Sequence, residues 1–472
     1  MIYRYAAWIL GWVVSIACTE NLVHSDEGWT IKAGFSKFDI TPTVPTPMAG
    51  YYHGRLSTET HDPLWCRATV LDDGTTKVAI VALDLITTTR WLTTETRERI
   101  QSETGIPASH VLISATHSHT GPVMYDPSNA RYQRMGNANP ATEKYMAELP
   151  DKILKCVADA ADNRREVRVM AGIGDEPKLA FNRRFFMNDG SVGWNPGKLN
   201  PKIVREAGPT DNSLPVVALF DQDTKPVGLL SNFSIHLDTV GGTQWSADMP
   251  HSMLQCLERV LGAGCHLQYS TGCCGDVNHI DVRSAYPQKG HEEAARIGTR
   301  LAAAVLRSWS DLQPVQGKKL IASTTIVTLP VAKHEPSRVD WANQIAEKSM
   351  QSPQPPFREM VEAFRILDIE SRKHQPYEVE VQVITLGKEL AWVSLPGEIF
   401  VQLGLAIKDG SPFKVTSVHE LANGSIGYIP TRQAYPQGNY EVISARCEQG
   451  SGELLVDAAL SQLRMHYSEQ LK

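Results

Sequence analysis

The stretch from Lys77 to Ala115 restricts the fold more than any other part of the chain. It begins with KVAIVALDL, a continuous apolar run typical of a strand buried on both faces. TTTRWLTTETRERIQSETG follows and predicts a helix that ends at Gly105. HVLISA then reads as a second buried strand. This order of strand, helix and strand predicts two parallel strands joined by a right-handed crossover.

Strand and helix patterns alternate along the rest of the chain. LPVVALFD and PVGLLSNFSI flank the turn QDTK and predict a hairpin that ends at His236. HEEAARIGTRLAAAVLRSW predicts an amphipathic helix, and YEVEVQVITLGKELAWVSLPGE predicts two strands around GK that end at Glu398. A helix is expected after Glu398 and another at the C-terminus. We therefore predict an α/β fold with mixed and partly parallel sheets flanked by helices.

Length and charge limit the domain organisation and the partners. No proline- or serine-rich linker divides the 472 residues, so we predict a single domain over residues 26–472. The charged stretch 332–375 is expected to form an insertion or a lid. The formal net charge of -6, with lysine and arginine scattered, gives no basic patch for nucleic acid, which we exclude as a partner.

The N-terminus has the pattern of a secretory signal. Arg4 precedes the apolar run AAWILGWVVSIA, which is too short to span a bilayer. Ser15 and Ala17 are small residues that fit cleavage at about 17/18, so residues 1–25 are predicted to be a signal segment and the chain to be exported. Cys18 would then be available for lipid attachment, as in a lipoprotein. The alternative is a buried N-terminal helix.

The cysteines do not form a recognisable metal or redox motif. Of the eight cysteines, seven remain if Cys18 leaves with the signal or carries a lipid, so at least one lacks an intramolecular partner. Export would permit disulfides, but their pairing cannot be read from the sequence. The adjacent Cys273 and Cys274 lack the second CxxC or HxxxH of a zinc finger, so structural cysteines are the preferred interpretation.

Four polar residues follow predicted strands and form a candidate metal site. His117 and His119 follow HVLISA, His236 follows the hairpin, and Glu398 follows LAWVSLPG. Loops at the carboxyl ends of strands converge into sites, and zinc takes imidazole and carboxylate ligands. If the strand continued, His117 and His119 would point to opposite faces, so one could bind metal while the other donates to substrate. The alternatives are surface histidines and, for Glu398, an acid in the first turn of a helix.

Several segments, taken in order, resemble one enzyme family. VLISATHSHTGP resembles the signature of the neutral/alkaline non-lysosomal ceramidases. FSKFDITP, AFNRR, NFSIHLDTV, STGCCGDVN, VQVITLGKELAWVSLPGE and GYIPTRQAYPQGNYE resemble further segments of that family. The similarity extends along most of the chain after the signal. The family's C-terminal immunoglobulin-like domain is expected to be absent, because the sequence ends soon after the last of these segments.

The resemblance implies two sets of site residues. One zinc ion per chain would be bound by His117, His236, Glu398 and Tyr428, with water completing the shell. The catalytic and substrate-contacting residues would be His119, Arg183, Tyr440 and Asn278. Within this set His119 would hydrogen-bond the substrate carbonyl, and Tyr440 would steady the tetrahedral intermediate.

The implied reaction is hydrolysis of an amide bond in a ceramide-like or other N-acyl lipid by metal-activated water. A lipid substrate would bring the enzyme to the edge of a membrane. One segment departs from the family: GDVNHI has Asn278 at the family's serine and His279 at its proline. This departure questions the ceramide specificity more than the zinc chemistry. The alternatives are a hydrolase of the same fold acting on an ester, peptide or sugar amide, an amidohydrolase-like barrel, and an inactive exported binding protein.

Overall fold

The predicted strand–helix–strand unit forms one edge of a large sheet. The computed structural model describes residues 30–127, 139–349 and 351–472. Strand β4 (Lys77–Leu83) and strand β5 (Val111–Ala115) pair in parallel, and helix α1 (Arg90–Thr104) connects them. The Thr89 side chain caps the first turn of α1, and Gly105, with a φ of 69°, ends the helix as expected.

The large sheet mixes parallel and antiparallel pairs. Its strands follow the order β14-β12-β11-β6-β1-β3-β4-β5, and β16 also pairs with β6. The remaining strands are β1 (Thr30–Asp39), β3 (Trp65–Asp72), β6 (Arg165–Asp175), β11 (Ser213–Phe220), β12 (Pro226–Phe233), β14 (His266–Thr271) and β16 (Gln313–Pro314). The predicted hairpin is β11 with β12, and the only parallel neighbours in this sheet's described part are β4–β5 and β12–β14. The sheet is therefore mixed, as predicted.

The two ends of the large sheet approach each other. The Gln268 amide on β14 donates to the Ile80 carbonyl on β4 over 3.2 Å. The Thr271 hydroxyl at the end of β14 donates to the Thr116 carbonyl, just after β5. The loops that follow β5 and β12 therefore meet, although these strands stand far apart in the order of the sheet.

A second sheet packs on one face of the first. It has the order β17-β18-β19-β21, formed by β17 (Leu320–Leu329), β18 (Tyr377–Leu386), β19 (Leu390–Ser394) and β21 (Val415–His419). Buried side chains of both sheets share one apolar cluster, with Ile80 and Leu230 from the first and Ile384 and Trp392 from the second. Continuous apolar runs such as KVAIVAL are explained by this arrangement, since both faces of the strands are covered.

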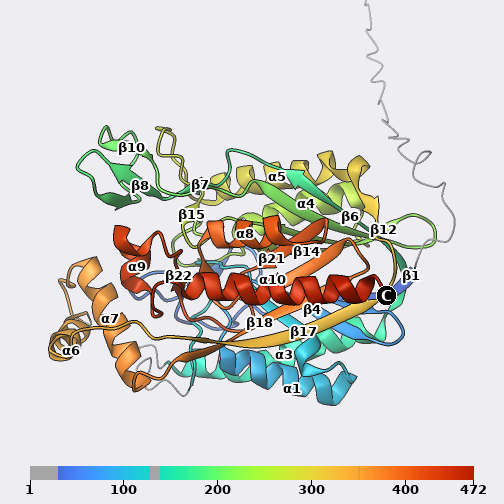
Figure 1. The fold of residues 1–472 in the computed structure, drawn as a ribbon, viewed down its shortest axis with the longest axis horizontal. Coiled ribbons are helices and arrows are strands. Elements are labelled where there is room, and N and C mark those ends of the chain that lie inside the picture. Colours follow the sequence, from blue (N-terminus) through green and yellow to red (C-terminus); the bar gives the residue numbers. More distant parts are fainter. Residues whose placement is uncertain (1–29, 128–138, 350) are drawn as a thin grey trace, which may run out of the picture.

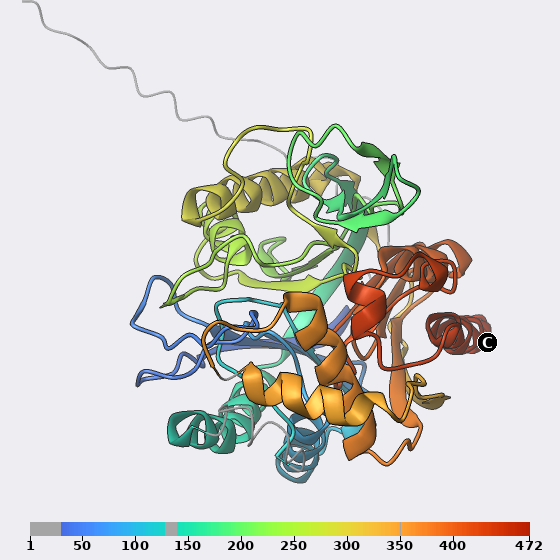
Figure 2. The same cartoon turned by 90° about the vertical axis from the view of Figure 1, so that its left-hand side faces the viewer.

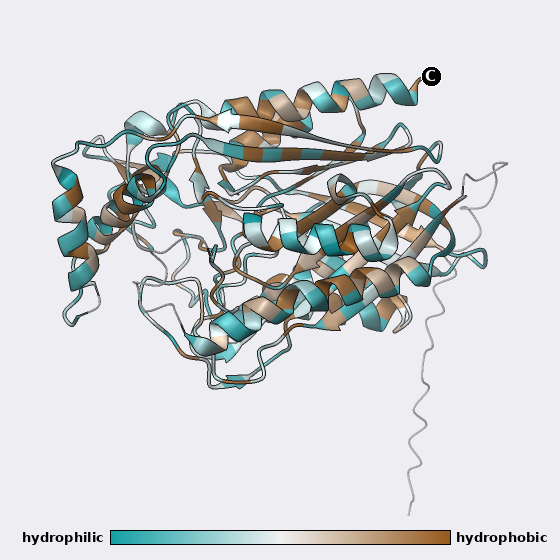
Figure 3. Cartoon of the chain, turned by 90° about the horizontal axis from the view of Figure 1, so that it is seen from below, coloured by the Kyte–Doolittle hydropathy of each residue, from teal (hydrophilic) through white to brown (hydrophobic). Residues whose placement is uncertain are grey.

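Helices cover the outer faces of the two sheets. Besides α1, the covering helices are α3 (Pro140–Asp162), α4 (Met249–Leu261), α5 (His291–Arg307), α8 (Val401–Gly410) and α10 (Ser451–Gln470). Helices α1 and α3 pack against one half of the large sheet, and α4 and α5 against the other half. Helices α8 and α10 pack on the second sheet. Figure 1 shows this layering, and Figure 3 shows the apolar strands between α10 on one side and helices on the other.

The predicted insertion at 332–375 contains two helices, α6 (Arg338–Lys348) and α7 (Phe357–Ser371). They pack on each other through a small apolar cluster of their own, which includes Ile345 and Phe364. Together with α9 (Tyr440–Ser444), β8 (Arg184–Met187) and β10 (Ile203–Glu206) they lie at one end of the molecule, which faces the viewer in Figure 2. The insertion is thus more helical than its charged sequence suggests.

Short strand pairs connect the loops at this end. They are β2 (Glu59–Thr60) with β13 (Gln244–Trp245), β7 (Phe181–Asn182) with β15 (Val277–Asn278), β20 (Glu398–Ile399) with β22 (Tyr428–Ile429), and β9 (Val192–Trp194) with β8. All seven cysteines in the described ranges are free thiols, so none of the disulfides that export would permit is formed there. In the described part of the chain, no helix is long and apolar enough to cross a bilayer. The predicted signal segment and Cys18 lie outside the described residues.

Candidate metal centre

A strained turn after β5 brings the two histidines of THSH together. Strand β5 ends at Ala115, and His117 adopts a φ of 73°, a conformation that is uncommon for a residue with a side chain. The backbone amides of His117 and Ser118 both donate to the Leu85 carbonyl, which holds the turn. The expectation of opposite faces therefore does not apply, because the strand stops before it could alternate the two side chains.

Three imidazoles meet beside this turn, two from the turn itself and one from the loop after β12. The Nε2 atoms of His117 and His236 lie 2.9 Å apart, and those of His117 and His119 lie 3.3 Å apart. His236 follows β12, and the His119 amide donates to the Leu237 carbonyl over 3.1 Å, joining the two loops. All three imidazoles are shielded from solvent. One nitrogen of each lies close enough to the others to bind the same ion. The structure thus unites the three histidines that the sequence placed after separate strands.

The protonation of these imidazoles favours a bound cation. His117 Nδ1 lies 2.8 Å from the Ile86 carbonyl, which can only accept, so Nδ1 carries the proton and Nε2 presents a lone pair. Burial, assisted by His117, lowers the pKa of His119 to about 3 and that of His236 well below its ordinary value. Imidazole nitrogens gathered this closely in a buried place are a donor set that fits a metal ion.

Glu398 completes the cluster. Its Oε2 lies 3.5 Å from His117 Nε2 and 3.9 Å from His236 Nε2. Within the described residues this buried oxygen has no hydrogen-bond partner. A buried carboxylate oxygen without a donor, beside two imidazole nitrogens, is the second observation that fits a metal ion. The residues predicted from the sequence as ligands, His117, His236 and Glu398, thus lie together.

Tyr428 stands beside Glu398 because their two short strands pair in parallel, with Glu398 and Tyr428 directly opposite each other. Burial raises the pKa of the Tyr428 phenol well above its ordinary value, and the Glu398 carboxylate raises it further. Its hydroxyl accepts a hydrogen bond from Arg183 Nη2 over 3.0 Å. The structure therefore brings the fourth predicted ligand to the same place, which spacing along the chain alone could not show.

A buried ion-pair network holds Arg183. Its Nε donates to Glu441 over 2.9 Å, and its Nη2 also donates to the Gly275 carbonyl over 2.7 Å. Arg184 donates to the other oxygen of Glu441 over 2.8 Å. Sequence reasoning missed Glu441, although it directly follows the predicted Tyr440 and stands in a segment the resemblance had already marked.

Aromatic side chains surround Tyr440. Its ring centroid lies 5.3 Å from Tyr428, 4.5 Å from Trp194 and 5.3 Å from Phe357, the first residue of α7. Tyr52 packs edge-on against Phe357 at 5.1 Å. The insertion thus contributes an apolar side chain next to a predicted catalytic residue, a contact that the charged sequence of 332–375 does not indicate.

Asn278 and His279, which depart from the family pattern, are both buried and hydrogen-bonded. Asn278 Nδ2 donates to Asn195 Oδ1 over 3.1 Å, and its Oδ1 accepts from the Ile280 amide. His279 Nδ1 lies 3.2 Å from Asp238 Oδ1. Although burial disfavours the charged imidazole, Asp238 raises the pKa of His279 above its ordinary value. The described hydrogen bonds of Asn278 do not reach the imidazole cluster, and its predicted role stays a prediction.

The backbone approaches the centre closely at two glycines. A Cβ on Gly275 would lie 2.5 Å from the Glu398 carbonyl oxygen, and a Cβ on Gly50 would lie 2.7 Å from His119. Gly50 also has a φ of 102°. Behind His236, the Cys274 thiol lies 3.8 Å from Nδ1 and donates to the fully buried Glu420 over 2.9 Å. Cys274 of the CC pair thus lies directly behind the centre, which the sequence does not reveal.

Fold and site together define an α/β protein with a buried histidine–carboxylate centre suited to a metal ion. Residues 31–245 match the family model described as neutral/alkaline non-lysosomal ceramidase, N-terminal. The neutral ceramidase from Pseudomonas aeruginosa has a similar fold, with a TM-score of 0.70 and 18% identity over 93% of this chain and 75% of that one. A structure described as ceramidase complexed with C2 has a TM-score of 0.69 and 17% identity over 92% of this chain and 75% of that one. The resemblance predicted from VLISATHSHTGP is confirmed over residues 31–245, and for the segments after residue 245 the similar folds agree with it.

Proposed function

We propose that the chain is a zinc-dependent amidase that hydrolyses the amide bond of a ceramide-like or other N-acyl lipid. The observation that carries this proposal is the meeting of three imidazole nitrogens and the unpartnered Glu398 oxygen in one buried cluster. His117, His236, Glu398 and Tyr428 would hold the ion. The family match and the ceramidase-like fold support the substrate class.

A bound zinc ion would polarise the amide carbonyl and lower the pKa of water to near neutrality. The protein's own groups then position the substrate and handle charge. His119 is neutral at pH 7, so it has one N–H to donate to the substrate carbonyl oxygen. The Tyr440 phenol, protonated because burial raises its pKa well above its ordinary value, is a second donor for the oxygen on which negative charge develops.

Arg183 acts in this proposal by positioning Tyr428 and by placing a positive charge at the edge of the site. Its donors are directed at Glu441, Gly275 and Tyr428, so a contact with substrate would use a guanidinium that is already fixed in place. Asn278 donates to Asn195 and not to the imidazole cluster, so it would contact the part of the substrate that lies near Asn195. The aromatic side chains Trp194 and Phe357 would line the path of an acyl chain.

Export and membrane contact belong to this proposal as well. The apolar run at residues 6–17 supports export, and the mature N-terminus, identified by mass spectrometry, tests it. Cleavage near 17/18, with or without lipid on Cys18, is expected; an intact Met1 in the exported fraction would contradict the signal.

A substrate panel tests the reaction. Fluorescent N-acyl sphingosines, N-acyl amino acids, acyl esters and short peptides are offered to the metal-loaded full chain. Release of fatty acid from N-acyl sphingosine, lost in His117→Ala and Glu398→Ala, is the expected result. Turnover of esters or peptides without any cleavage of N-acyl sphingosine would refute the ceramide-like substrate and favour the alternative hydrolase. No turnover of any substrate by metal-loaded protein would favour an inactive binding protein.

A further inference from the structure

A second group of histidines surrounds a buried aspartate away from the catalytic cluster. His61 and Asp62 lie between β2 and β3, His251 lies in the first turn of α4, and His291 is the first residue of α5. The rings of His61 and His291 stack with centroids 3.5 Å apart. Ligand atoms of His61, Asp62 and His291 all lie within 4.8 Å of one another. The loop before β3 and the start of α5 thus bring two imidazoles and a carboxylate together, and His251 of α4 lies beside that carboxylate.

Asp62 orients these imidazoles in the manner of a metal site. His61 Nδ1 lies 2.8 Å from Asp62 Oδ2, and because a carboxylate only accepts, this nitrogen carries the proton. His61 Nε2 therefore presents its lone pair outward, the tautomer that a carboxylate imposes on a metal-binding histidine. His251 Nδ1 faces the other oxygen of Asp62 at 3.6 Å. The Asp62 carboxylate thus orients His61 by a hydrogen bond and also lies near His251.

The carboxylate of Asp62 is itself fixed in place. It is 3% exposed, and it accepts from Ser246 Oγ and from the Ala247 amide, both over 2.7 Å. A rigid second layer of this kind is what keeps metal-binding imidazoles in a productive orientation. The arrangement is therefore pre-formed and not a chance meeting of surface side chains.

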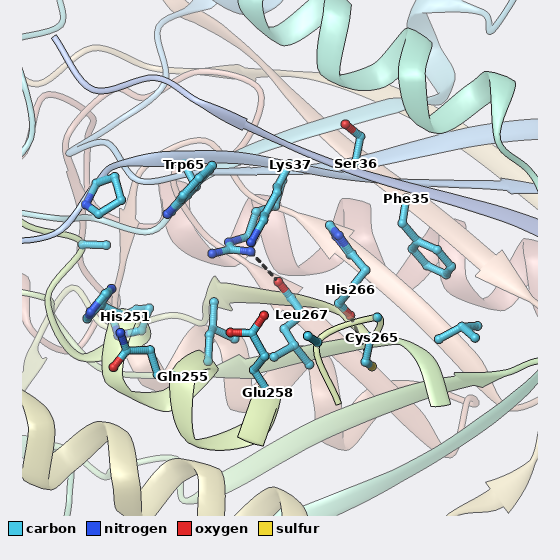
Figure 4. A pocket seen from close by; sticks show the side chains of 18 of the residues that line it. Phe35, Ser36, Lys37, Trp65, His251, Gln255, Glu258, Cys265, His266 and Leu267 are labelled. Atoms are coloured by element: carbon cyan, nitrogen blue, oxygen red, sulfur yellow. Dashed lines mark hydrogen bonds between the residues drawn. The ribbon is translucent and has the colours of Figure 1, made fainter. Parts of the chain in front are cut away.

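An ion can reach the group from solvent. The His61 side chain is 42% exposed. His251 also stands at one end of a cavity of about 640 Å³ beside β1, β3, β14 and α4, and Figure 4 shows it there with Gln255 and Glu258 further along the wall. None of the predicted catalytic or zinc-binding residues lines this cavity. Burial and the neighbouring His61 lower the pKa of His291, which keeps its imidazole neutral and able to bind.

A third group, His334, Glu370 and His374, differs in a decisive way. There the Nε2 atoms of both imidazoles contact the same Glu370 oxygen, at 2.8 and 2.9 Å. Those nitrogens are occupied by a carboxylate that bridges them, so they are not free to bind an ion. This group serves as the matched control for the group around Asp62.

We propose that His61 and His291, with Asp62 between β2 and β3 beside them, form a second binding site for a divalent ion of the zinc type, and that His251 lies next to this site. Imidazole-rich sites of this kind suit Zn²⁺, Ni²⁺ and Cu²⁺ rather than Ca²⁺ or Mg²⁺. An ion there would tie α5 to the loop before β3. Hydrogen bonds would also connect this ion to the turn that holds His117 and His119. Ser118 Oγ donates to the Ser246 carbonyl, and the Ser246 hydroxyl donates to Asp62.

Zinc titration of the full chain tests the proposal. Protein stripped with a chelator is titrated with ZnCl2 by calorimetry, and bound zinc is counted by mass spectrometry under native conditions. Wild type is expected to bind two ions. The double variant His61→Asn/His291→Asn is expected to bind one, and the asparagine at 61 keeps a donor for Asp62. His374→Asn, the control, is expected to bind two. Thermal unfolding of each apo variant checks that it is folded.

The outcomes separate this proposal from the proposed function. If the double variant binds as much zinc as wild type, or if His374→Asn loses one ion instead, the second site is refuted. If wild type binds one ion that the double variant loses and His117→Ala retains, the second site stands and the catalytic zinc fails. If wild type binds one ion that only His117→Ala loses, the catalytic zinc stands and the second site fails.

Discussion

Replacement of Glu441 by glutamine tests the buried network that supports the centre. Glu441 is fully buried and accepts from Arg183 and Arg184, whose side chains are 3% and 2% exposed. Breaking a buried ion pair by removing one partner costs about 3–5 kcal/mol, because the other charge stays buried without compensation. Glutamine keeps one acceptor oxygen but leaves two guanidinium charges unpaired. We therefore expect a loss of about 3 kcal/mol in the free energy of unfolding, toward the lower end of that range.

The same substitution should weaken metal binding without touching a ligand. Arg183 donates to the Tyr428 hydroxyl, so an unanchored Arg183 no longer fixes that predicted ligand. Loss of a supporting partner of this kind typically lowers metal affinity about 10–100-fold. Urea unfolding of apoprotein measures the stability, where a lower midpoint with an unchanged slope is expected. Competition with a zinc-binding dye measures the affinity.

Glu206→Gln is the matched control, since Glu206 also pairs with an arginine but on the surface. Its side chain is 37% exposed and that of its partner Arg283 is 69% exposed. Exposed pairs of this kind contribute about 0–1 kcal/mol. If Glu441→Gln lost no more stability than Glu206→Gln and bound zinc as tightly as wild type, the network would have no supporting role and this reasoning would be wrong.

Three further changes test other parts of the account. Gly275→Ala would place a Cβ 2.5 Å from the Glu398 carbonyl oxygen, so we expect the free energy of unfolding to fall by about 1–3 kcal/mol and hydrolytic activity to be lost. Gly264→Ala is the control, because its Cβ would meet nothing within 4 Å, and it should change neither quantity. Burial raises the pKa of Asp248 from 3.8 to about 6, so the folded chain binds more protons than the unfolded chain in that window and stability falls as the pH rises through it. Asp248→Asn keeps an acceptor at the cap of α4 and should remove this pH-dependent loss, which amounts to about 3 kcal/mol. The plot of unfolding free energy against pH should then be flatter. An unchanged plot would show that Asp248 is not the group responsible. Phe357→Ala should raise KM for long-chain N-acyl substrates more than for a two-carbon acyl chain with little change in kcat, whereas an equal effect on both chain lengths would remove the insertion from the acyl path.

Much of the fold could be predicted because its signals are local. The buried run KVAIVAL, the hairpin around QDTK and the long amphipathic helix α5 each carry their own periodicity, and all three are present. The approach of the two ends of the large sheet was not predictable in this way. It depends on side chains such as Gln268 and Thr271, whose partners are far away in the sequence and have no periodic pattern.

The site residues also separate into those that the local sequence could predict and those that only the fold reveals. His117, His236 and Glu398 could be proposed because each follows a strand, and the structure brings them together. The turn conformation of His117 could not, since nothing in THSH requires a positive φ. Glu441 escaped notice because an acid in a helical turn usually faces solvent, and only the fold shows that it is buried against two arginines.

Loss and recovery of hydrolysis with zinc tests the central claim most directly. Wild type and His117→Ala are stripped of metal, and release of fatty acid from a fluorescent N-acyl sphingosine is followed before and after zinc is added back. The account predicts that stripped wild type is inactive, that zinc restores it, and that His117→Ala stays inactive with zinc. Hydrolysis by stripped wild type at the rate of the loaded enzyme, or full activity of His117→Ala, would contradict it.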